Sequence, residues 1–158
     1  ASGILGGTLH IASHAFGKIT LFFCAGAIYV ASGKTEINQL KGIAKAMPWT
    51  MTAFVIGAFS IIGLPPTGGF ISKWYILLGS IENEEFIILI VLIVSTILSA
   101  AYLLPIIYFS FFALPIENID HSEAPTPILI ALAISVLLTF ALFFYPDPIF
   151  NLAKEIGI

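Results

Sequence analysis

The sequence predicts an all-α membrane protein, a polytopic bundle of about four transmembrane helices in which the second helix is discontinuous. Hydrophobic residues make up 59% of the 158-residue chain, and charged residues only 9%. A soluble domain of this size could not hide so much apolar surface from water. The apolar runs are also long and continuous, whereas a transmembrane β-barrel would show short alternating segments. Both observations favour helices within a lipid bilayer.

Four apolar stretches satisfy the rule that about 20 residues cross the hydrocarbon core. We expect them at residues 4–31, 48–81, 86–113 and 126–145. The second stretch is too long for one straight helix, and residues 64–69 should interrupt it. The tail, 147–158, has apolar residues at the spacing of a short interfacial helix.

The loops predict how the bundle is oriented in the cell (inner) membrane. Loop 32–47 carries three lysines against a single glutamate, whereas loops 79–85 and 114–127 carry acids and no lysine. Because lysine and arginine accumulate on the inner side, loop 32–47 should be cytoplasmic and the C-terminus outside. We expect the acidic stretch 117–123, with His121, to be a solvated loop.

The first span places three titratable side chains, His10, His14 and Lys18, on one stripe of a helix. Side chains four residues apart lie about 6 Å from each other, so one water can bridge two of them. Imidazole both accepts and donates a proton near neutral pH. The stripe therefore predicts a proton relay, with simple hydrogen bonding to a neighbouring helix as the alternative. Lysine is a poor metal ligand and no carboxylate lies in any span, so we predict no metal site.

The second span combines a charge with a helix break. Pro65 and Pro66 remove two backbone donors, Gly68 and Gly69 should loosen the chain, and the only charged residue of the span, Lys73, follows. A charge and freed backbone groups are both costly in lipid. A helix N-terminus also disfavours a nearby cation. We therefore expect a lysine that loads and unloads a proton, or a break whose carbonyls coordinate a cation; the alternative is a plain proline kink.

The remaining polar positions give weaker signals. Ser95, Ser99 and Tyr102 share one face of the third span, where they form a possible water path or only hold helices together. Neither Lys18 nor Lys73 has an acidic residue within the spans. We therefore expect the counter-ions to come from missing sequence or another subunit, and the chain to be the C-terminal portion of a longer protein.

No motif predicts a cofactor or a catalytic residue. The chain has one cysteine, which excludes an iron–sulfur cluster held by this chain alone, and it lacks the glycine fingerprint of dinucleotide sites. It also lacks a basic patch, so a nucleic-acid partner is not expected.

Three segments resemble a known family of antiporter-like membrane subunits. His10–Phe22 resembles its His-x3-His-Ala-x2-Lys-x2-Leu-Phe helix, 40–48 resembles the loop that follows, and Gly63–Lys73 resembles its broken twelfth helix. The family comprises proton-pumping subunits of respiratory complex I, the A and D subunits of Mrp-type cation/proton antiporters, and relatives in membrane-bound hydrogenases. The resemblance covers nearly the whole chain.

The resemblance implies that residues 1–158 are a partial proton-antiporter transmembrane domain, corresponding to helices eleven to fourteen of a fourteen-helix core. It places His10, His14 and Lys18 on a central hydrophilic axis and gives Lys73 the transfer of a proton to the outer half-channel. The partners it implies are the lipid bilayer, other subunits of a multi-subunit membrane complex, protons and, as a further candidate, sodium ions.

The function expected from this resemblance is proton/cation translocation as the D subunit of an Mrp-type Na+/H+ antiporter. A lysine rather than a glutamate at position 73 favours this branch over some complex I subunits. The alternatives are a proton-pumping subunit of NADH:quinone oxidoreductase or of a membrane-bound hydrogenase, whose redox chemistry would lie in other subunits, and a purely structural membrane subunit.

Overall fold

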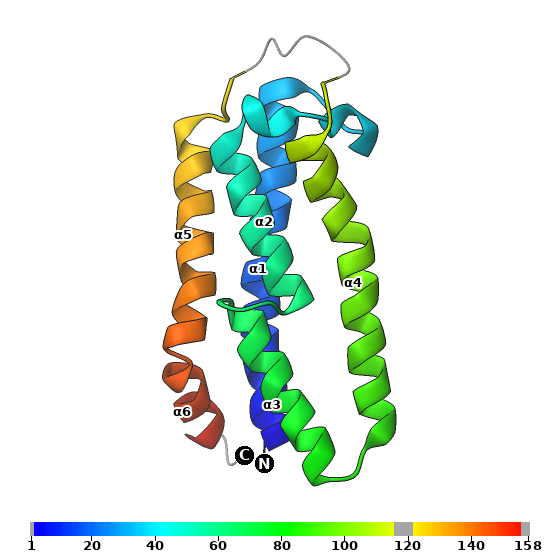
Figure 1. Ribbon diagram of the computed structural model, residues 1–158. Coiled ribbons are helices and arrows are strands. Elements are labelled where there is room, and N and C mark those ends of the chain that lie inside the picture. Colours follow the sequence, from blue (N-terminus) through cyan, green and yellow to red (C-terminus); the bar gives the residue numbers. More distant parts are fainter. Residues whose placement is uncertain (1, 116–121, 156–158) are drawn as a thin grey trace.

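A computed structural model describes residues 2–115 and 122–155, and every regular element in these residues is a helix (Figure 1). The α-helices are α1 (Ser2–Ser32), α2 (Pro48–Ile62), α3 (Gly68–Glu82), α4 (Phe86–Phe112), α5 (Thr126–Phe144) and α6 (Asp147–Glu155). Two short 3-10 helices, η1 (Ile37–Leu40) and η2 (Ile43–Lys45), lie in the loop between α1 and α2. The expected all-α fold class is confirmed.

Three of these helices, α1, α4 and α5, are long and apolar enough to cross a membrane. Their bounds lie close to those expected for the first, third and fourth spans. The expected interfacial tail contains α6, and residues 156–158 of that tail lie outside the described part of the chain. The second span is divided between α2 and α3.

The interruption between α2 and α3 differs in position from the expected one. Each half has 15 residues, or about 22 Å of helix, so neither half alone crosses a core of about 30 Å. In Figure 1, α3 continues below the loop that ends α2. Gly63 caps α2 with φ +87°, a left-handed conformation that favours glycine. The break therefore covers residues 63–67 rather than 64–69.

Gly68 and Gly69 lie in the first turn of α3 and not in the break, which corrects the expectation that they loosen the chain. Both are buried against neighbouring elements. A Cβ on Gly69 would lie 1.8 Å from the Ser60 carbonyl oxygen, and one on Gly68 would lie 2.8 Å from Leu142 Cβ. These glycines therefore allow α3 to pack directly against α2 and α5.

Helix α1 packs against α2, α3 and α5, so it lies at the centre of the described bundle (Figure 1). Its buried face consists mainly of small residues, which let helices approach closely in a membrane protein. The buried residues are Gly6, Leu9, Ser13, Gly17, Thr20, Cys24, Ala27 and Ile28. At Gly6, a Cβ would lie 2.5 Å from the Ile76 backbone nitrogen of α3.

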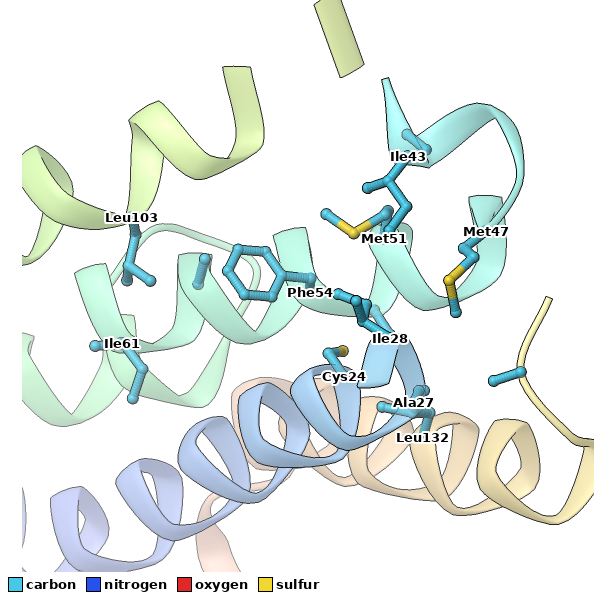
Figure 2. Close-up of a cluster of buried hydrophobic side chains, with 14 of the residues drawn as sticks. Cys24, Ala27, Ile28, Ile43, Met47, Met51, Phe54, Ile61, Leu103 and Leu132 are labelled. Carbon is cyan, nitrogen blue, oxygen red and sulfur yellow. The ribbon is translucent and has the colours of Figure 1, made fainter. Parts of the chain in front are cut away.

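A larger apolar cluster joins α1, α2 and α4 (Figure 2). Cys24 and Ile28 of α1 meet Met51 and Phe54 of α2, and Leu103 of α4 closes one side. The cluster fixes α2 against α1, and thereby fixes the position of the break at which α2 ends.

The N-terminus of α2 is capped by Glu123, which precedes α5. Its carboxylate accepts hydrogen bonds from the Trp49 backbone N–H (2.9 Å) and from the Thr50 hydroxyl. A carboxylate at this end of a helix satisfies free N–H groups and complements the helix dipole. The sequence predicted a solvated loop over residues 117–123, and this prediction is wrong for Glu123, which binds the end of α2. Residues 117–121 of that stretch lie outside the described part of the chain.

Replacing Glu123 by alanine is expected to lower the free energy of unfolding by about 1–2 kcal/mol, because two hydrogen bonds at the α2 terminus are lost. The check is the thermal unfolding midpoint of the purified protein, with Glu155→Ala as the control that removes an exposed carboxylate from α6. Equal midpoints for the two variants would show that the cap contributes nothing.

Candidate functional site

Lys73 lies on α3, but its ammonium group reaches back to the end of α2. Nζ donates hydrogen bonds to the Ile62 carbonyl (2.8 Å) and to Thr96 Oγ1 of α4 (2.9 Å). In a continuous helix the Ile62 carbonyl would accept from the residue four positions later, which here is Pro66 and has no N–H. The lysine therefore supplies the donor that the proline removes.

This geometry corrects the expectation about the helix dipole. The C-terminal end of a helix carries partial negative charge and favours a cation. The flexible four-carbon stem of Lys73 brings its charge to that end of α2, away from the N-terminus of its own helix. Gly63 leaves room for the stem, since a Cβ there would lie 2.7 Å from Lys73 Cδ. Both acceptors of the ammonium are uncharged.

A cavity of about 270 Å³ adjoins Lys73 between α3 and α4. Its walls are mostly apolar and include Phe70, Trp74 and Ile93. An ammonium group has three N–H donors, and the bonds to Ile62 and Thr96 leave the third available to a guest in this cavity. The volume is sufficient for water molecules, and the third N–H of the lysine would give such a water a polar partner.

A second polar cluster joins α3 to α1 through Ser72, the residue before Lys73. The Ser72 hydroxyl lies 3.0 Å from His10 Nδ1 and 3.2 Å from the Ser13 hydroxyl. Ser13 and Ser72 are both buried. These two serines were not singled out from sequence, although Ser13 lies one helical turn after His10 and Ser72 is next to the candidate lysine.

The predicted stripe on α1 is only partly enclosed. The His10 ring is half-buried and lies 5.6 Å from the His14 ring, measured between centroids. The side chains of His14 and Lys18 are exposed in the described bundle. A lysine facing lipid at mid-membrane would be costly. The expectation that other protein covers this face and supplies a counter-ion therefore stays a prediction.

The expected water path on α4 lies apart from Lys73. Ser95 and Tyr102 are exposed, and the hydroxyls of Ser95 and Ser99 bond to carbonyls of their own helix. Thr96, which sequence reasoning missed, is the α4 residue that contacts the lysine. The only signal for it was a threonine within an apolar span. A water path along the Ser95 face stays a prediction.

The assembled groups suit proton exchange better than metal binding. Within residues 2–115 and 122–155, no group of three or more His, Cys, Asp or Glu side chains could hold a metal ion. The ammonium at the helix break contacts a carbonyl and a hydroxyl, and a separate cluster on α3 and α1 brings together the Ser72 hydroxyl and the His10 and His14 imidazoles. Ammonium, hydroxyl and imidazole groups can each donate a hydrogen bond and, in their neutral form, accept one. Proton transfer between the break and α1 stays a prediction.

Known proteins that resemble this chain give a second line of evidence. Residues 1–99 match the family model described as NADH:quinone oxidoreductase/Mrp antiporter, TM. The chain is 47% identical over 104 residues to the N subunit of the NADH-quinone oxidoreductase of Desulforudis audaxviator. The aligned region covers 66% of this chain and 21% of that protein. It is 30% identical over 155 residues to the D subunit of the Na(+)/H(+) antiporter of Alkalihalophilus pseudofirmus. That aligned region covers 98% of this chain and 31% of that protein.

Among solved structures, the membrane-bound sulfane sulfur reductase, an archaeal respiratory membrane complex, contains a similar chain. The TM-score is 0.85 at 29% identity, and the match covers 99% of this chain and 26% of that one. The chain thus spans between about a fifth and a third of the length of these relatives.

Proposed function

We propose, from the fact that this chain belongs to the NADH:quinone oxidoreductase/Mrp antiporter transmembrane family, that it forms part of a membrane subunit that translocates protons. The observation that carries this proposal is the ammonium of Lys73, which lies at a helix break between a backbone carbonyl and a hydroxyl. Neither acceptor is charged, so the lysine can lose its proton without leaving a buried carboxylate unpaired.

In this proposal Lys73 is the loading or exit site at the break. His10 and His14 connect it to Lys18, which acts as the mid-membrane relay. The hydrogen bond between His10 and Ser72 holds the first ring against α3, the helix that carries Lys73, and the spacing of the two imidazole rings supports the link between them. Water in the cavity beside α3 would hydrate the lysine. Loop 32–47 would face the cytoplasm and the C-terminus the outside.

We propose that cation/proton exchange drives the transport. This is the process named in the description of one relative, the D subunit of a Na(+)/H(+) antiporter. Its support is a match along 98% of this chain. A redox-driven proton pump is the second candidate, and it is favoured by the 47% identity to a component of an NADH-quinone oxidoreductase. In either case the chain would work beside other subunits, since the archaeal structural relative belongs to a respiratory membrane complex.

The experiment that separates these candidates is proton flux in inverted vesicles that contain the intact complex. Flux triggered by adding sodium without an electron donor is the expected result. Flux that requires an electron donor and ignores sodium would overturn the exchange proposal and favour the redox pump. A complex that moves no protons under either condition would give the chain a structural role.

Replacing Thr96 by valine is expected to slow proton flux by roughly tenfold, about 1.4 kcal/mol of barrier, because the lysine loses its hydroxyl acceptor at nearly constant side-chain volume. The matched control is Thr52→Val, which removes an exposed α2 hydroxyl bonded to the Pro48 carbonyl of its own helix. The measurement is the initial flux rate at equal amounts of complex. Equal rates for the two variants would remove Thr96 from the site.

A further inference from the structure

The cavity beside Lys73 opens at the surface of the described bundle, between α3 and α4. Three of the side chains that line it, Trp74, Ile93 and Ile97, keep 49%, 54% and 61% of their surface exposed. Both helices belong to apolar spans of the sequence, and among the described residues no element covers the mouth between them. A molecule dissolved in the bilayer can therefore reach the cavity sideways.

The cavity has room for a small organic molecule. Its volume is about 270 Å³, whereas an engineered apolar cavity of about 150 Å³ already binds benzene. An aromatic ring with a short chain therefore fits. The lining side chains are mostly apolar, and Lys73 supplies the one charge among the described residues that line it. Apolar walls with a few polar groups are typical of ligand sites.

The polar end of the cavity selects a ligand that accepts hydrogen bonds. The Thr96 hydroxyl donates to the Leu92 carbonyl (2.9 Å) and accepts from Lys73, so its hydrogen is already used. The third N–H of the ammonium is left for a ligand. Since both present acceptors of the ammonium are uncharged, an anionic acceptor would complement it best. A compact carboxylate fits this position, whereas a phosphate brings three oxygens that one N–H cannot satisfy.

We propose that this cavity binds small hydrophobic carboxylic acids, with the carboxylate on the Lys73 ammonium and the apolar part between Trp74 and Ile93. A neutral acid that enters from lipid and meets the neutral amine forms the same ion pair, because its proton moves to the amine. The ligand takes the place of water beside the lysine. An adjacent anion favours the charged ammonium, so the lysine keeps its proton and transport slows. The inhibition rests on the proposed proton transport, whereas the binding does not.

The test uses 3-phenylpropionate labelled with carbon-13 in its carboxyl group, and the intact complex in vesicles with nitrogen-15 in its lysine ammonium groups. Solid-state magnetic resonance detects dipolar coupling between the two labels when they are in contact. Ile93→Trp fills the cavity, and the matched control is Val94→Trp, at the next position of α4 and outside the cavity lining. Lys73→Ala removes the labelled nitrogen of the site, and Lys45→Ala removes one from an exposed loop lysine.

We expect the coupling in wild type, Val94→Trp and Lys45→Ala, and its loss in Ile93→Trp and Lys73→Ala. Wild-type proton flux should fall as the probe is added and level off when the site is full. The uncharged 3-phenylpropanamide should need a concentration at least roughly tenfold higher for the same inhibition, because it lacks the charge that the ammonium attracts.

A wild-type complex whose flux falls without any coupling would overturn the inference, since the acid would then act through the lipid. A carboxylate of another subunit already bound to Lys73 would also give no coupling and overturn it. So would equal inhibition by the amide, or a coupling that persists in Lys73→Ala. If Ile93→Trp does not assemble, wild type beside Lys73→Ala still decides. Coupling in wild type together with wild-type flux in Lys73→Ala would overturn the proposed transport and keep the binding site.

Discussion

Replacing Lys73 by alanine is expected to reduce proton translocation by at least roughly a hundredfold, the size of effect associated with losing a positioned acid–base group. The complex should still assemble, because Lys73 is not a member of the apolar cluster that fixes α2 against α1 (Figure 2). The variant leaves the Ile62 carbonyl without the lysine donor, at a cost of about 1–3 kcal/mol. That cost is a modest part of a typical unfolding free energy of about 5–15 kcal/mol.

The measurement is flux in vesicles at matched amounts of complex, together with the amount of complex recovered from the membrane. Lys45→Ala is the control, since it removes an exposed lysine from the loop between α1 and α2. We expect it to transport at the wild-type rate. Wild-type transport by Lys73→Ala would make the lysine a structural residue.

The second large effect is expected at Gly69, where alanine should prevent α3 from docking on α2. The added Cβ would lie 1.8 Å from the Ser60 carbonyl oxygen and 2.8 Å from its carbon. Both are backbone atoms, so a side-chain rotation cannot relieve the overlap. Overpacking costs typically about 1–3 kcal/mol even where side chains can adjust. We therefore expect more than about 3 kcal/mol here, seen as a lower unfolding midpoint and less assembled complex.

Gly7→Ala is the matched control for this prediction. Gly7 lies within α1, and a Cβ there would meet nothing within 4 Å among the described residues. Alanine is also favoured over glycine inside a helix by up to about 1 kcal/mol. We expect this control to keep or raise the unfolding midpoint. A Gly69→Ala variant as stable as Gly7→Ala would show that α3 does not pack as described.

The transmembrane architecture could be predicted from sequence because its signals are local. Long apolar runs define α1, α4 and α5, and Pro65 and Pro66 mark a break since they cannot donate hydrogen bonds wherever they lie. Lys73 could also be recognised locally, because a single charge in an apolar span costs free energy in a membrane and therefore indicates a functional residue.

The contacts of the site could not be predicted in the same way, because they depend on how helices pack. Whether Gly69 is flexible or closely packed depends on Ser60 of another helix. Thr96 directly follows Ser95 on α4, yet only Thr96 contacts the lysine, whereas the Ser95 hydroxyl bonds to its own helix. Glu123 caps a helix that begins far earlier in the chain. None of these relations has a sequence spacing that identifies it.

In the proposed transport, Lys73 must give up and regain a proton. The most direct test is the proton flux of Lys73→Arg beside Lys73→Ala in the same vesicles. Arginine keeps the positive charge and can still donate hydrogen bonds at the end of α2, but it is not deprotonated in proteins. We expect Lys73→Arg to assemble and to be as inactive as Lys73→Ala. Transport by Lys73→Arg at the wild-type rate would show that a fixed charge at the helix break is sufficient, and it would contradict proton transfer through Lys73.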